Sequence, residues 1–221
     1  MRNIAISFLV LLSFFTLHGQ ENDPDTAYTR VLIGRADKFL PEIADANAEG
    51  EKYIRVRDII VQQYKDLSAI HDTRDEKVKM LRSEENMDKI SLNRKIDSIK
   101  TDARVQIFEL HAAYIGKLGA ELTPEQVNMV KDGMTYGVLP RTYQGYLDML
   151  PDLTDTQKRQ ILAWLTEARE LAMDMGSSKK KHATFGKYKG RINNYLSNEG
   201  YDLKKASLER EEQVRKEKEN K

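Results

Sequence analysis

Apolar residues recur every three or four positions along most of the chain, a spacing that predicts one buried face on each of several α-helices. Two long apolar stripes flank a charge-rich stretch, residues 73–89, whose sequence is compatible with either helix or loop. The stripes predict a long antiparallel helical hairpin, preceded by a shorter helix over residues 25–39. Gly116 and Gly119 are expected to end the second hairpin helix, because glycine is common just past a helix end. The stripes are Tyr53, Val56, Ile60, Tyr64 and Leu67, then Ile96, Ile99, Ala103, Ile107, Leu110 and Tyr114.

Two Leu-Thr-x-x-Gln segments, 122–126 and 153–157, predict helix starts in the second half of the chain. In each, the threonine is placed to cap the helix while the glutamine reaches back, which is the capping-box pattern. The helix after Thr154 is expected to end at Gly176. Its predicted buried stripe is Ile161, Trp164, Leu165, Ala168, Leu171, Ala172 and Met175. Sustained period-two alternation is absent, so the expected fold is all-α: the long hairpin packed with several shorter C-terminal helices.

The first 19 residues are typical of a cleavable signal peptide. Arg2 precedes a 14-residue apolar run, Ile4 to Leu17, which is shorter than the roughly 20 residues needed to span a bilayer. Gly19 suits a peptidase site before Gln20, and an uncleaved N-terminal anchor is the alternative. No cysteine follows for a lipid anchor. We therefore expect a periplasmic or secreted protein without stable membrane insertion. It would comprise one helical domain over 20–203 and a charged tail over 204–221, helical or frayed.

Charge and composition narrow the functional classes. The chain has 36 Lys+Arg against 35 Asp+Glu and no cysteine, which excludes disulfides, thiol catalysis and cysteine-ligated metals. The histidines lack metal-ligand spacing, and no phosphate-binding loop or nucleophile elbow occurs, so no catalytic residue, metal or cofactor is predicted. An enzyme remains a third alternative, with Glu167, Arg169 or His182 as polar neighbours of a cleft. A formal net charge of only +1 and the expected export argue against nucleic acid as a partner.

Residues 133–146 form the first candidate binding segment. Three tyrosines, three glycines and a proline within fourteen residues predict a turn between helices. An exposed tyrosine there could stack on a sugar ring and bind its hydroxyl groups. Tyr136 and Tyr143 are the candidates, although Tyr143 and Tyr146 are spaced to share one buried helix face.

Residues 179–201 form the second candidate segment, in which six basic residues are interleaved with aromatic rings and no acidic residue occurs from Met175 to Asn198. Cations, rings and amides together suit an anionic, hydroxyl-rich ligand, and a carboxylate could bind Arg191 in a bidentate manner. Trp164 is a further possible stacking residue. The alternative is a solvated basic face whose rings pack inward. The predicted ligand-binding residues are Tyr136, Tyr143, His182, Lys187, Tyr188, Lys189, Arg191, Asn193, Asn194 and Tyr195.

Residues 132–154 and 161–205, including the peptide FGKYKGRINNYL, resemble an exported bacterial family of unknown function that is described as sugar-binding. The resemblance implies a helical exported protein serving glycan uptake or breakdown, and it supplies no catalytic residues. We therefore expect a non-enzymatic protein that binds carbohydrate, specifically an acidic, uronate-containing glycan or its fragments.

The paired Leu-Thr-x-x-Gln segments are also similar to the repeated motif of small periplasmic chaperones of the Spy and CpxP type. Only the second copy has a basic residue after its glutamine, Lys158, as in that family. A chaperone or stress protein of this kind is therefore the alternative function.

Overall fold

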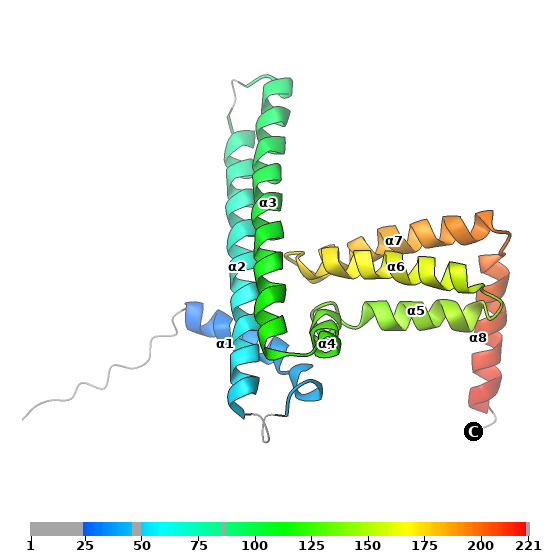
Figure 1. Cartoon of the computed structure of the whole chain (residues 1–221). Helices are drawn as coiled ribbons and strands as arrows, with labels where there is room; N and C mark the ends of the chain where they lie inside the picture. The colour runs from blue at the N-terminus through cyan, green and yellow to red at the C-terminus, as the bar shows by residue number, and fades with distance from the viewer. Residues whose placement is uncertain (1–23, 46–49, 85–86, 220–221) are drawn as a thin grey trace, which may run out of the picture.

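The computed structural model describes residues 24–45, 50–84 and 87–219, and all regular elements there are helical, which confirms the all-α prediction (Figure 1). The predicted signal peptide lies outside these residues. The elements are α1 (Pro24–Ala36), the 3-10 helix η1 (Leu40–Glu42), α2 (Gly50–Arg82), α3 (Lys89–Glu121), α4 (Pro124–Met134), α5 (Val138–Met149), α6 (Asp155–Met173), α7 (Ser178–Asn198) and α8 (Leu203–Glu219).

The predicted hairpin is formed by α2 and α3, two antiparallel helices of 33 residues each and about 50 Å long. Most of the charge-rich stretch continues α2 as far as Arg82. The predicted helix end at Gly116 and Gly119 is wrong, because α3 continues to Glu121. Leu118 between the two glycines is fully buried, and the N–H of Leu122 donates to its carbonyl, so packing extends the helix past both.

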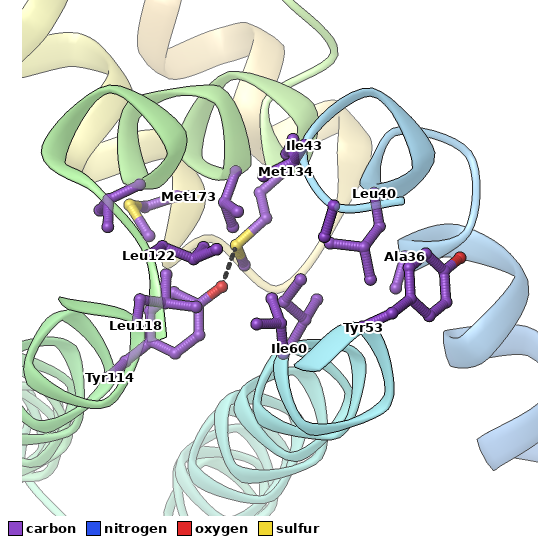
Figure 2. Packing of buried hydrophobic residues seen from close by; sticks show 14 residues of the cluster. Ala36, Leu40, Ile43, Tyr53, Ile60, Tyr114, Leu118, Leu122, Met134 and Met173 are labelled. Carbon is purple, nitrogen blue, oxygen red and sulfur yellow. Dashed lines mark hydrogen bonds between the residues drawn. The ribbon is translucent and has the colours of Figure 1, made fainter. Parts of the chain in front are cut away.

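The first core lies where the base of this hairpin meets α1, η1 and α4 (Figure 2). Tyr114 projects into it from α3, and its buried hydroxyl donates a hydrogen bond to the sulfur of Met134 at 3.1 Å. Met173, at the end of α6, also packs in this core and connects it with the second half of the chain. Buried members include Leu40, Val56, Ile60, Leu118, Val130, Met134 and Met173.

The second core is formed by α5, α6 and α7, which lie across the hairpin axis, with α8 at their far end (Figure 1). It includes Ile161, Leu165, Ala168, Ala172, Phe185, Ile192 and Leu196. Leu171 of the predicted stripe is instead 47% exposed, and α6 ends at Met173, before the predicted Gly176. Leu171 lies beside the buried stripe, which steps from Leu165 through Ala168 to Ala172.

Both predicted capping boxes are present and also hold distant parts of the chain. The side chains of Thr123 and Thr154 accept from the backbone N–H groups of Gln126 and Gln157, and the glutamine side chains reach back to the cap N–H groups. Gln126 also donates to the carbonyl of Ile43 at 2.8 Å, which fastens α4 to the segment after η1. Gln157 accepts from the hydroxyl of Tyr201 at 3.0 Å, which fastens α6 to the start of α8.

The last helix, α8, has no buried residue. Within the described ranges, no helix combines the length and apolar character required to cross a membrane.

Candidate functional site

A pocket of about 810 Å³ lies at the junction of the two halves of the molecule. One side is formed by α1, the η1 segment and the middle of α2. The other side is formed by the α4–α5 turn and the α6–α7 turn. We call it the junction pocket. Its lining includes Tyr28, Arg35, Lys38, Phe39, Tyr64, His71, Asp132, Tyr136, Ser177, Ser178 and Lys181.

Lys181 is a buried cation in the wall of this pocket, with only 5% of its surface exposed. It shares a helical stripe with Phe185, Tyr188 and Ile192, so the face of α7 that builds the second core also turns this lysine inward. Its Nζ donates to the carbonyl of Met134 at 2.8 Å and lies 5.4 Å from the centre of the Tyr64 ring.

No carboxylate oxygen in the described ranges lies within 4.0 Å of the Lys181 ammonium. Burial lowers the pKa of Lys181 to about 8; the charge of Asp174 acts in the opposite direction, and Arg35 lowers the pKa further. A buried ammonium normally requires a paired anion, so this lysine leaves an unmet electrostatic requirement at the pocket.

Other groups add positive potential at the same place. Arg35 and Lys38 are exposed and line the pocket beside α1. Ser177 caps α7 through the backbone N–H of Lys180, so the positive end of a 21-residue helix also faces this region. Three acidic residues also line the pocket: Asp132 is paired with Arg169 at 3.0 Å, while Glu42 and Asp72 offset part of the positive potential of Arg35 and Lys38.

Tyr136 stands at the rim of the junction pocket in an unusual backbone conformation. Its φ is 61°, and the next residue, Gly137, has a φ of 62°. Left-handed backbone is costly for a residue with a bulky side chain, and such strain concentrates at functional sites. The Tyr136 ring is 49% exposed and stacks on His182, with ring centroids 5.5 Å apart.

A buried charge network lies behind the pocket and joins α3, α4 and α6. Arg169 donates to Asp132 at 3.0 Å and to Asn128 at 2.7 Å, while Lys131 donates to Glu170 at 2.9 Å. Burial raises the pKa of Glu170, but hydrogen bonds from His111 and Lys131 outweigh it and lower that pKa to about 2.

Two histidines extend the network toward α2. His111 contacts Asp174 at 2.8 Å, and this bond, with a second to Glu170, raises the pKa of His111 to about 9. His71 lies 2.8 Å from the carbonyl of Asp174 through Nε2, and Arg74 approaches its Nδ1 at 2.8 Å. Because arginine can only donate, Nδ1 accepts and Nε2 carries the proton. No three His, Asp or Glu side chains of the described residues gather in metal-binding geometry.

The sequence profile of one family, described as "Protein of unknown function (DUF3826)", matches residues 29–216. The chain belongs to the DUF3826 family. The match covers every helix described above except the first residues of α1 and the last of α8. No curated protein matches the chain.

In this DUF3826 member the predicted binding residues do not form one site. Tyr136 and His182 are brought together at the rim of the junction pocket. His182 and Lys189 line an adjoining open hollow of about 500 Å³. Tyr143 packs half-buried against the second core, Asn193 accepts from the Tyr146 hydroxyl at 2.6 Å, and Lys187 and Asn194 are exposed on α7.

The remaining predicted residues form a separate surface that we call the outer α6–α7 face, made of Trp164, Glu167, Tyr188, Arg191 and Tyr195. The Arg191 guanidinium lies 5.1 Å from the Tyr188 ring centre and 5.8 Å from that of Trp164. It also pairs with Glu167 at 3.7 Å, so the lack of acidic residues in its own segment does not leave this cation without a counter-ion. The counter-ion comes from the neighbouring helix, outside the acid-free segment.

Sequence reasoning missed Lys181 and Arg35 as site residues. Lys181 belongs to the second candidate segment. Its spacing from Phe185 and Ile192 places it on the same helix face as these apolar residues, which indicates that it points inward. Nothing local marked Arg35, since α1 meets the α6–α7 turn only through the tertiary fold. Of the residues considered for an enzyme, Arg169 belongs to the buried charge network and Glu167 to the outer α6–α7 face.

Proposed function

We propose that this DUF3826 protein binds a small acidic carbohydrate, a carboxylate-bearing sugar or a fragment of an acidic glycan, in the junction pocket. One observation carries the proposal: a buried lysine lines an 810 Å³ pocket and has no carboxylate partner among the described residues. A ligand carboxylate would supply the missing negative charge. Charge-assisted hydrogen bonds of this type are about twice as strong as neutral ones.

The remaining lining suits the sugar part of such a ligand. Ser177 and Ser178 offer hydroxyl groups, and Tyr28, Tyr64 and Tyr136 offer ring faces with polar tips. Aromatic rings and a few placed polar groups are typical of small-molecule pockets, whose usual volumes of roughly 300–1,000 Å³ include this one. The N-terminal sequence supports export as part of the same proposal, which would give the protein access to extracellular glycans.

The proposal is tested by calorimetric titration with digalacturonate, with the neutral disaccharide maltose as the comparison ligand. The wild-type protein should bind digalacturonate and show no heat with maltose. Lys181→Met should weaken binding by about 10-fold or more, because a hydrogen bond to a charged group is worth about 1.5–3 kcal/mol. Lys187→Met, a matched change at an exposed position of α7, should leave affinity within about 2-fold. Equal losses in the two variants, or binding of neither sugar, would overturn the proposal.

A chaperone-like function is the second candidate, and exposed apolar side chains on the hairpin favour it. On α3, Val105 is 52% exposed and Phe108 is 73% exposed, and on α2 Met80 is 69% exposed. This alternative predicts that the protein suppresses aggregation of a denatured client and that Phe108→Ser reduces the effect. Unchanged client aggregation, measured by light scattering, would exclude it.

A further inference from the structure

We propose that Lys181 is a nucleophilic amine that forms a reversible imine with an oxo acid, a ligand that carries both a carbonyl group and a carboxylate. The inference deepens the proposed function and rests on it, because the junction pocket would hold the carboxylate of the same ligand. Protonated Lys181 pairs with that carboxylate, whereas uncharged Lys181 attacks the carbonyl group while Arg35 holds the carboxylate. Arg35 lines the pocket and has no carboxylate within 4.0 Å in the described residues.

The surroundings of Lys181 favour a free amine. An ammonium group has three donors, and the structure gives this one a single hydrogen-bond acceptor, the carbonyl of Met134. With a pKa near 8, lowered mainly by burial, about half of the Lys181 side chains are uncharged at pH 8. An ordinary lysine with a pKa of about 10.4 is uncharged in well under 1% of molecules at that pH, a difference on the order of 100-fold.

Two of the acidic groups near the amine have cationic partners. Asp132 is paired with Arg169, and Asp174 contacts His111. Neither therefore forms a direct ion pair with Lys181. Such an ion pair would keep the Lys181 amine protonated. The titratable groups on the elements around the amine are Tyr28 and Arg35 of α1, Lys38 just after it, Glu42 of η1, Tyr64, His71 and Asp72 of α2, Asp132 of α4, Tyr136 of the α4–α5 turn and Asp174 at the end of α6.

The step is an addition followed by loss of water. The nitrogen lone pair of Lys181 attacks the carbonyl carbon, a C–N bond forms, the C–O π bond opens, and a proton moves from nitrogen to oxygen. The C–O bond of this carbinolamine then breaks, the hydroxyl group takes up a proton and leaves as water, and a C=N bond remains. Hydrolysis reverses the sequence, so no oxidant or reductant is consumed. A buried lysine of lowered pKa is suited to such chemistry.

Reductive trapping tests the inference. The full protein is incubated at pH 8 with glyoxylate and cyanoborohydride, whose hydride reduces an imine to a stable secondary amine, and modified lysines are located by peptide mass mapping. Lys181 should be modified at least 10-fold faster than exposed Lys187. Acetaldehyde, which has a carbonyl but no carboxylate, should also prefer Lys181 because of its free amine, but at least about 3-fold less than glyoxylate does. Even labelling of the lysines by glyoxylate would overturn the inference.

Two variants and an acidic sugar without a free carbonyl group distinguish failure of imine formation from failure of ligand binding. Arg35→Met should reduce the preference of glyoxylate for Lys181 to that shown by acetaldehyde, because the free amine remains while the carboxylate is no longer held. Lys181→Arg should remove trapping at this position yet retain binding of methyl galacturonoside, an acidic sugar locked against opening to a carbonyl form. Binding of this sugar without selective trapping refutes the imine alone. Absence of both refutes the proposed function as well.

Discussion

Lys181 and Arg191 lie ten residues apart on the same helix and have opposite environments. Lys181 is buried in the wall of the junction pocket and has no carboxylate within 4.0 Å among the described residues. Arg191 lies on the outer α6–α7 face between two rings, paired with Glu167, and its side chain is 54% exposed. The exposed Arg191 has a carboxylate partner within the protein, whereas the buried Lys181 contacts only a carbonyl oxygen and a ring among the described residues. Exposure and charge alone therefore favour Arg191 as a binding residue, whereas the lack of a paired carboxylate among the described residues is the basis for proposing Lys181 instead.

The largest expected effect comes from breaking the charge network behind the pocket. Arg169→Met should lower the free energy of unfolding by about 3–5 kcal/mol, because Asp132 and Asn128 would lose their buried partner. Arg191→Met on the outer face should cost about 1 kcal/mol or less, since its ion pair is exposed. Urea denaturation followed by circular dichroism measures both changes. Similar losses in the two variants would contradict the contrast between the regions.

The second effect tests how closely the pocket region is packed. A Cβ at Gly133 would lie 2.3 Å from the base of the Phe39 ring, whereas one at Gly119 would meet nothing within 4 Å. Gly133→Ala should therefore destabilise the protein by about 1–3 kcal/mol. Gly119→Ala should stabilise it by about 0.5–1 kcal/mol, because alanine favours a helix interior. Thermal unfolding of both variants provides the measurement, and a stabilising Gly133→Ala would show that Phe39 moves freely.

The smallest effect is a pH dependence of the network. The pKa of His111 is raised to about 9 by its bonds to Asp174 and Glu170, from 6.5 in the unfolded chain. Protonated His111 therefore stabilises the fold fully below pH 6.5, and this contribution disappears as the pH rises through 9. The stability difference between wild type and His111→Gln should be on the order of 1–2 kcal/mol larger at pH 6 than at pH 9.5. A difference that does not change with pH would contradict the assigned contacts.

Features coded within a few residues were predictable from the sequence. The capping boxes at Thr123 and Thr154 depend only on residues three positions apart. The hairpin stripes depend only on the helical spacing of apolar residues, every three or four positions. The end of α3 was not predictable by the same means. There, tertiary burial of Leu118 outweighs the low helix propensity of the two flanking glycines.

The site was harder to predict because it is assembled from distant segments. Tyr136 could be proposed from its turn sequence, and its partner His182 from the basic segment. The identity of the uncompensated cation could not be read from charge runs, since Arg191 receives Glu167 from another helix while Lys181 receives none. Which basic residue lacks an anion depends on how α7 packs against α6 and, at Lys181, against Tyr64 of α2.

The division of the interior into two cores has a calorimetric consequence. The junction pocket takes one wall from elements of the first core and part of the other from the α6–α7 turn beside the second. A molecule seated there stabilises only conformations in which both halves are intact. Saturating ligand should thus make the two halves melt together, as a single sharper heat-absorption peak at a higher temperature.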